Sequence, residues 1–207
     1  MHTEAVRALK RRDPTLARII RRVGPCRLRP GRGYFAALCE AIISQQLSTK
    51  VAAVLCARFR GLFPRKAPTP AAVLALSDAE LRGAGLSRQK TAYLRDLARH
   101  FADGQVPSRR LGRMADDEII AVLTRVKGIG VWTVQMFLIF VMDRPDVLPV
   151  ADLGLRKAVQ QHYGLADLPS AEVLTELAAS WRPHRSVATW YLWQSLNNQP
   201  LKKRRSR

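Results

Sequence analysis

The chain has 207 residues, the length of one compact domain or of two small lobes that pack closely. Hydrophobic residues make up 47% and the mean hydropathy is -0.12, values that exclude a disordered or fibrous chain. The 35 basic residues, 27 of them Arg, outnumber the 16 acidic residues and give a formal net charge of +19. Because Arg matches phosphate through two parallel hydrogen bonds, this charge favours a nucleic acid as partner, although an Arg-rich genome would produce the same bias.

The cysteines and the hydropathy pattern indicate where the protein works. Cys26, Cys39 and Cys56 are odd in number and lack C-x-x-C spacing, so they predict neither a disulfide framework nor a zinc site. The longest apolar run, 131–142, is interrupted and is too short to cross a bilayer, and the first residues lack the apolar stretch of a signal peptide. We therefore expect a cytoplasmic protein, nucleoid-associated if the source is bacterial, with no membrane partner.

Nearly every segment has helical periodicity and no hairpin signal stands out, so the pattern predicts an all-α fold. A helix over 3–23, which Pro14 can divide, precedes a loop rich in Pro, Gly and Arg. Two helices over 34–63 meet near 44–48, where Ser48 can cap the second. Short helices follow at 70–75, 78–83, 87–103 and 116–124, each with Thr, Ser or Asp at its start suited to capping.

Residues 116–141 are typical of two helices joined by a tight glycine loop. Gly128 and Gly130 let the backbone approach a partner closely, and the next helix presents its first N–H groups to a phosphate oxygen. Such a helix-hairpin-helix positions nucleic acid through its backbone without reading sequence. An ordinary helix turn would have the same pattern, but the positive charge favours phosphate binding, with Lys127, Gly128, Ile129 and Gly130 as the DNA-binding candidates.

Asp152 ends a loop that contains Pro149 and begins the next helix. Backbone N–H groups and the helix dipole stabilise a carboxylate anion at such a position. Position alone fits two interpretations, a simple helix cap or a catalytic acid.

Together these residues resemble the helix-hairpin-helix (HhH-GPD) DNA glycosylase superfamily. The hairpin continues into Trp132, and Asp152 follows 20 residues later in P-x-x-D; upstream, 42–48 is similar to the family's Gln-containing helix end. Downstream, 181–186 followed by Trp193 is similar to the closing helix of 3-methyladenine DNA glycosylase II. The resemblance covers about 30–198. It implies one two-lobed helical unit with the active-site cleft between lobe A, about 34–112, and lobe B, about 1–33 plus 113–200, followed by a basic tail at 201–207.

The resemblance also implies roles for single residues. Ionised Asp152 would stabilise the oxocarbenium-like sugar and orient or deprotonate the attacking water. Trp132, Met136 and Trp193 would form the base pocket, where an indole face attracts a positively charged alkylated purine by about 0.5–2 kcal/mol. Either Trp could instead be a core residue.

Base flipping leaves a gap in the duplex that a side chain must fill. Gln46 matches the family's inserted residue, and Leu86 on a glycine-rich turn is a second wedge candidate. Their alternatives are a polar helix-end residue and a core leucine.

Two departures distinguish this chain from the endonuclease III branch. Trp132 stands where bifunctional members carry Lys, and an indole cannot form a Schiff base, so no lyase step is expected. The four C-terminal cysteines of that branch are missing, so no iron–sulfur cluster is expected. As in relatives, the backbone carbonyls of Thr124, Val126 and Ile129 could hold a structural Na+ or K+; no other cofactor is expected.

The sequence thus predicts a monofunctional DNA glycosylase that acts as a monomer in base excision repair. It would excise alkylated purines of the 3-methyladenine and 7-methylguanine type from double-stranded DNA. Two alternatives stay open, a noncatalytic binder of damaged or bent DNA and a glycosylase for deaminated or oxidised bases.

Overall fold

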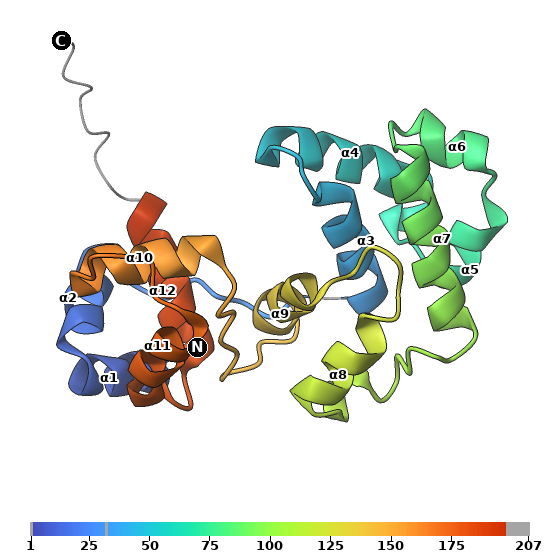
Figure 1. The fold of residues 1–207 in the computed structure, drawn as a ribbon. Coiled ribbons are helices and arrows are strands. Elements are labelled where there is room, and N and C mark those ends of the chain that lie inside the picture. Colours follow the sequence, from blue (N-terminus) through green and yellow to red (C-terminus); the bar gives the residue numbers. More distant parts are fainter. Residues whose placement is uncertain (1, 32, 198–207) are drawn as a thin grey trace, which may run out of the picture. The chain divides into compact units, whose positions relative to one another are not determined.

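A computed structural model describes residues 2–31 and 33–197 (Figure 1). In this part of the chain the regular elements are α-helices and short 3-10 turns, with no strand, so the predicted all-α class is confirmed. The contacts divide the chain into a terminal unit, residues 1–29 with 143–207, and a central unit, residues 30–142. None of the described helices is both long enough and apolar enough to span a membrane.

The terminal unit packs its last helix against helices from both ends of the chain. Its helices are α1 (Thr3–Arg12), α2 (Pro14–Val23), α10 (Leu153–Tyr163), α11 (Ala171–Leu177) and α12 (Arg185–Asn197), with the 3-10 turn η3 (Ala178–Trp181). Helix α12 contacts both α2 and α10, and α1 lies against α2. This packing brings residues near the N-terminus together with the segment that carries Asp152.

The division predicted at Pro14 is confirmed, and a buried acid explains it. Asp13 is 6% exposed and caps α2, because its side chain accepts a hydrogen bond from the N–H of Leu16 at 2.9 Å. It also accepts from the Tyr163 hydroxyl at 2.6 Å and from the Trp181 indole at 2.8 Å. Asp13 therefore lies between the two helices, and its carboxylate starts α2 and joins it to Tyr163 and Trp181 in the C-terminal half of the unit.

The central unit contains the remaining helices. They are α3 (Tyr34–Ser44), α4 (Thr49–Gly61), α5 (Pro70–Ala75), α6 (Asp78–Gly83), α7 (Arg88–Ala102), α8 (Asp116–Leu123) and α9 (Val131–Phe140), with the 3-10 turns η1 (Pro64–Lys66) and η2 (Leu111–Arg113). Helix α7 packs against α5 and α3, and α9 packs against α3 and α8.

Local capping chemistry accounts for most of the helix starts. Ser48, Thr69, Ser77 and Ser87 each accept a hydrogen bond from the backbone of the following helix, as predicted. The expected acidic cap of α8 is wrong. Asp116 is already the first helical residue, and the N-cap position is Ala115. The backbone N–H of Ala115 donates to the Glu118 carboxylate at 2.8 Å.

The unit boundary differs from the expected lobes. We expected about 113–200 to belong with the chain ends, but the contacts group residues up to 142, with α8 and α9, in the central unit, because α9 packs against α3 and α8 packs against α9. The basic tail expected at 201–207 lies outside the described residues.

Candidate active site

Asp152 begins α10 and has two donors on one oxygen. Its Oδ1 accepts a hydrogen bond from the N–H of Leu155 at 2.6 Å and another from the Trp193 indole at 2.8 Å. The side chain is partly exposed. Two N–H donors at a helix N-terminus suit a carboxylate anion and hold it in one orientation. The structure therefore brings together two of the predicted site residues, Asp152 and Trp193, within one unit.

Gly154, which was not predicted as a site residue, leaves room for this contact. Gly154 lies in the first turn of α10, where an added Cβ would come within 3.1 Å of Asp152 Oδ1 and 3.4 Å of the Trp193 ring. A side chain there would crowd both partners. The available signal was a glycine two residues after a capping Asp, at a helical position where glycine is unfavourable.

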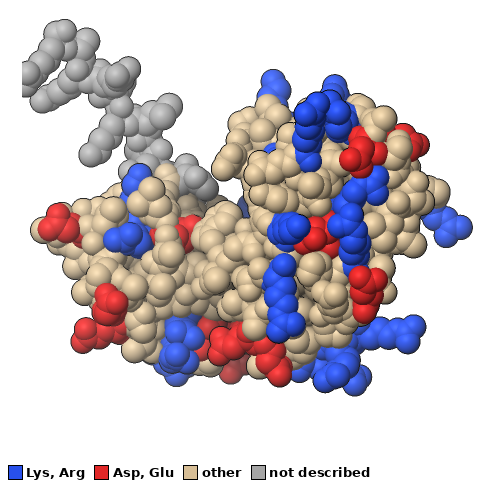
Figure 2. Space-filling view, turned by 45° about the vertical axis from the view of Figure 1, so that its right-hand side comes forward, with Lys and Arg blue, Asp and Glu red and all other residues tan. Residues whose placement is uncertain are grey.

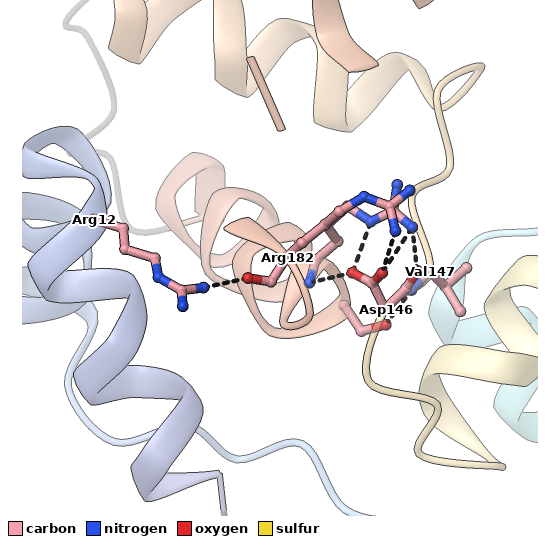
Figure 3. A network of polar contacts seen from close by, with 6 residues as sticks. Arg12, Asp146, Val147 and Arg182 are labelled. Carbon is pink, nitrogen blue, oxygen red and sulfur yellow. Dashed lines mark hydrogen bonds and ion pairs between the residues drawn. The ribbon is translucent and has the colours of Figure 1, made fainter. Parts of the chain in front are cut away.

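The loop that leads to Asp152 is anchored by ion pairs at the start of α12 (Figure 3). The Asp146 carboxylate accepts hydrogen bonds from Arg185 Nε at 2.7 Å and Nη2 at 2.9 Å, and from Arg182 Nη1 at 3.0 Å. The Arg182 carbonyl in turn accepts from the Arg12 side chain. Charge-assisted bonds of this kind are stronger than neutral ones.

Backbone contacts reinforce the same anchor. The N–H of Val147 donates to the Ser186 hydroxyl at 3.0 Å, and the N–H of Ser186 donates to the Pro145 carbonyl at 3.1 Å. Helix α12 therefore holds the loop at both ends. Its first turn binds loop residues 145–147, and Trp193 binds Asp152. Asp146 was not predicted from the sequence, because its partners, Arg182 and Arg185, lie 36 and 39 positions later and nothing local marks them.

The glycine hairpin between α8 and α9 is present as predicted and packs tightly on α7. Gly128 has a φ of 82°, and a Cβ there would lie 2.2 Å from the Tyr93 ring, so both the backbone conformation and the space require glycine. The N–H of Lys127 donates to Asp96 Oδ2 at 2.9 Å. The Gly128 carbonyl accepts from Gln45 Nε2 at 2.7 Å. These contacts fix the loop from two sides.

The hairpin residues therefore differ in what they present to the outside. The Lys127 side chain is exposed, whereas Ile129 is 4% exposed and its side chain belongs to the core. Gly130 is exposed and precedes α9, whose first N–H groups are those predicted to face a phosphate.

The two wedge candidates also differ. Gln46 is exposed and has a left-handed backbone with a φ of 57°, at the end of α3. Leu86 is 4% exposed, so it packs in the core as its alternative interpretation expects.

Lys90 stabilises the turn after α3 that contains Gln46, since its Nζ donates to the carbonyls of Ile43 at 2.6 Å and Gln45 at 3.0 Å. Desolvation lowers the pKa of Lys90.

The pocket residues of α9 line two cavities. Trp132 is 50% exposed, which excludes a buried core role, and it lines a cavity of about 420 Å³ together with Gln45, Gln46 and Tyr93. Met136, one turn later, lines a cavity of about 220 Å³ instead. Phe140, which the sequence analysis missed, also lines the smaller cavity and is 40% exposed. Thr133 borders both cavities.

One of the three carbonyls named for a monovalent cation has a hydrogen-bond partner within the hairpin. The Val126 carbonyl already accepts the N–H of Ile129 at 3.1 Å, and a carbonyl oxygen has a second lone pair. Within the described ranges, no group of three His, Cys, Asp or Glu side chains could hold a metal ion.

Basic side chains lie at several places on one face of the protein. On the face that Figure 2 shows, Lys and Arg side chains lie at many separate points with acidic groups between several of them. A distributed charge attracts a polyanion without orienting it.

The glycine hairpin between α8 and α9, followed by Asp152 at the start of α10, defines a helix-hairpin-helix protein of the glycosylase type. The family model described as HhH-GPD superfamily base excision DNA repair protein matches residues 39–183. The chain thus belongs to the HhH-GPD superfamily and, within it, to the 3-methyladenine DNA glycosylase family.

Two curated relatives illustrate this membership. DNA-3-methyladenine glycosylase 1 of Schizosaccharomyces pombe is 32% identical over 190 residues, which cover 88% of this chain and 82% of that protein. A putative DNA-3-methyladenine glycosylase of Bacillus subtilis is 35% identical over 165 residues, which cover 77% of this chain but 58% of the relative.

Two solved structures have the same fold. The Schizosaccharomyces pombe 3-methyladenine DNA glycosylase in complex with abasic DNA matches with a TM-score of 0.81 and 32% identity, over 93% of this chain and 96% of that chain. A DNA-3-methyladenine glycosidase from Bacillus halodurans matches with a TM-score of 0.85 and 31% identity, over 94% and 89%.

Proposed function

We propose that this protein is a monofunctional DNA glycosylase that excises alkylated purines, such as 3-methyladenine and 7-methylguanine, from double-stranded DNA. The observation that carries the proposal is the arrangement at Asp152, a carboxylate held by a helix N-terminus and by the Trp193 indole. The names of the relatives and the abasic DNA bound to one of them support the substrate class.

Asp152 would act on the sugar. Departure of the base leaves positive charge on the deoxyribose, which a nearby carboxylate stabilises. The same group can orient the water that attacks C1′ and take up its proton. An alkylated purine is already a good leaving group, so one anion suffices. Because two donors hold Oδ1, the carboxylate is oriented before DNA binds.

The absence of a lyase step is part of the proposal. A lyase needs an amine that forms a Schiff base with the sugar, and bifunctional relatives carry it at the position of Trp132. The indole at this position supports hydrolysis, with an abasic site and a free base as products.

The remaining residues would bind the DNA. The exposed Lys127 side chain and the N-terminus of α9 would hold a phosphate, and a monovalent cation at the carbonyls of Thr124, Val126 and Ile129 would add positive charge there. The exposure of Gln46 supports its insertion into the gap left by the flipped base.

Asp152→Asn tests the proposal, because the change removes the charge and keeps the shape. Free-base release from randomly methylated duplex DNA should fall by about 100-fold or more, while DNA affinity is retained. Identification of the liberated bases distinguishes alkylated purines from deaminated or oxidised ones. Excision by the variant near the wild-type rate would overturn the role of Asp152. Absence of turnover in the wild type would favour a noncatalytic binder.

A further inference from the structure

The lining of the smaller cavity of the central unit includes Glu40, an acidic residue that the proposed mechanism does not use. On the α9 side its lining is largely apolar, with Met136 and Phe140 among the residues there. On the α3 side it is lined by Ala37, Glu40, Ala41 and Ser44. Glu40 is the ionisable residue of this described lining. A carboxylate beside an apolar cavity favours an occupant that carries positive charge.

Glu40 has one ion-pair partner among the described residues, Arg60. Glu40 Oε1 accepts a hydrogen bond from Arg60 Nη1 at 2.8 Å, and the two side chains are 38% and 42% exposed. A half-solvated pair of this kind is weak, because water screens both charges. The carboxylate has two oxygens that can accept several hydrogen bonds, so Arg60 does not exhaust its capacity.

The charge of the substrate changes during the reaction. A purine alkylated at N3 or N7 is positively charged while it is attached to the sugar. When the C1′–N bond breaks, both bonding electrons stay with the base, which becomes neutral as the charge passes to the sugar. A carboxylate next to the base therefore stabilises the bound substrate more than the transition state. Such an interaction lowers KM without raising kcat.

We propose that Glu40 selects positively charged N-alkylpurines over neutral damaged bases by attracting the substrate's charge to the Met136 cavity. The inference rests on the proposed function, in which Met136 contributes to the base pocket. It assigns Glu40 to substrate capture, whereas Asp152 acts on the sugar. The neutral free base leaves more readily than its charged precursor would.

The test uses Glu40→Gln, which keeps the shape and removes the charge. Kinetics are measured on a duplex with one 7-methylguanine, with a hypoxanthine duplex as the neutral competitor. KM for 7-methylguanine should rise about 2–5-fold, the range for a half-exposed charge pair, with kcat unchanged or higher. The inhibition constant of the hypoxanthine duplex should not change.

Two further variants serve as controls. Arg60→Gln removes the partner of Glu40, so it should lower the 7-methylguanine KM relative to the hypoxanthine inhibition constant. Glu176→Gln removes one exposed negative charge elsewhere, on α11, and should leave that ratio unchanged.

Two results would overturn the assignment of Glu40. One is an unchanged KM for 7-methylguanine in Glu40→Gln, and the other is an equal change for charged and neutral duplexes. A wild type that releases no base would instead refute the proposed function. In that case the dissociation constants of the two duplexes, compared between wild type and Glu40→Gln, still test the charge preference.

Discussion

Gly154→Ala should separate the stability of the protein from its activity. In a helix interior alanine is more favourable than glycine by about 1 kcal/mol, so the substitution alone would stabilise α10. The gain would be smaller than this in the first turn. The new Cβ, however, would lie 3.1 Å from Asp152 Oδ1 and 3.4 Å from Trp193 Cδ1 and Nε1. Those contacts are tight enough that the carboxylate or the indole must move by a few tenths of an ångström.

The displacement determines the expected loss of activity. Misplacing a catalytic group by 1 Å can cost about 100-fold in rate, so a few tenths of an ångström correspond to about 3–10-fold. We expect kcat for 7-methylguanine release to fall by this factor, with an unfolding free energy within about 1 kcal/mol of the wild type. Single-turnover base release and urea unfolding measure the two quantities.

Gly61→Ala is the matched control, because a Cβ at Gly61, the last residue of α4, meets nothing within 4 Å. It should leave kcat unchanged. If Gly154→Ala has the kcat of the wild type and the same stability change as Gly61→Ala, then the reasoning that links this glycine to the Asp152–Trp193 contact is wrong.

Three further substitutions probe the anchored loop, the hairpin and the pH dependence. Asp146→Asn removes the charge that holds Arg182 and Arg185. We expect urea unfolding to show about 1.5–3 kcal/mol lower stability, and kcat to fall while DNA affinity is retained. A reduction in DNA affinity alone would contradict the positioning role of Asp146. Gly128→Ala would force a left-handed residue against the Tyr93 ring, so thermal unfolding should show a loss of at least about 1–3 kcal/mol, and a wild-type Tm would refute the packing. Desolvation, with the charges of Arg22 and Arg18, lowers the pKa of His162. The unfolded chain then binds more protons between that lowered pKa and about 6.5, so stability should rise with pH up to about 6.5, and urea unfolding across pH should show a flatter profile for His162→Gln.

The helices were predictable because their signals are local. Pro14, Ser48 and the glycines of the hairpin each act on neighbouring backbone, so a single sequence shows where one helix ends and the next begins. The exception was the start of α8, where Asp116 and Glu118 are both acidic residues suited to the first turn. Which of them binds the backbone at the N-cap depends on the backbone group that each carboxylate reaches, and in the structure Glu118 binds it.

The supports of the candidate site were not predictable, because they come from distant positions. Asp96 holds Lys127, and Gln45 holds Gly128, across 31 and 83 residues. The pair Gln45 and Gln46 shows the limit clearly. Gln45 binds the hairpin, whereas Gln46 has a left-handed backbone and is exposed, and two adjacent glutamines give no local signal that distinguishes them.

The same limit applied to Leu86, since a leucine after a glycine turn is compatible with both a wedge and a core residue. Its burial at 4% exposure is a tertiary property of the central unit. Composition and spacing therefore leave open which way each side chain faces, and the packing of the central unit decides it for Leu86.

Helix α12 explains how a loop can hold the carboxylate that we propose to be catalytic in place. Arg185 fixes the loop at Asp146, and Trp193 fixes it again at Asp152; the two α12 residues lie eight positions apart, about 12 Å along a helix. Both ends of the segment therefore depend on one rigid element of the terminal unit. Substitutions in α12 that leave the hairpin intact should accordingly change kcat rather than DNA affinity, because they move the carboxylate and not the residues proposed to bind phosphate.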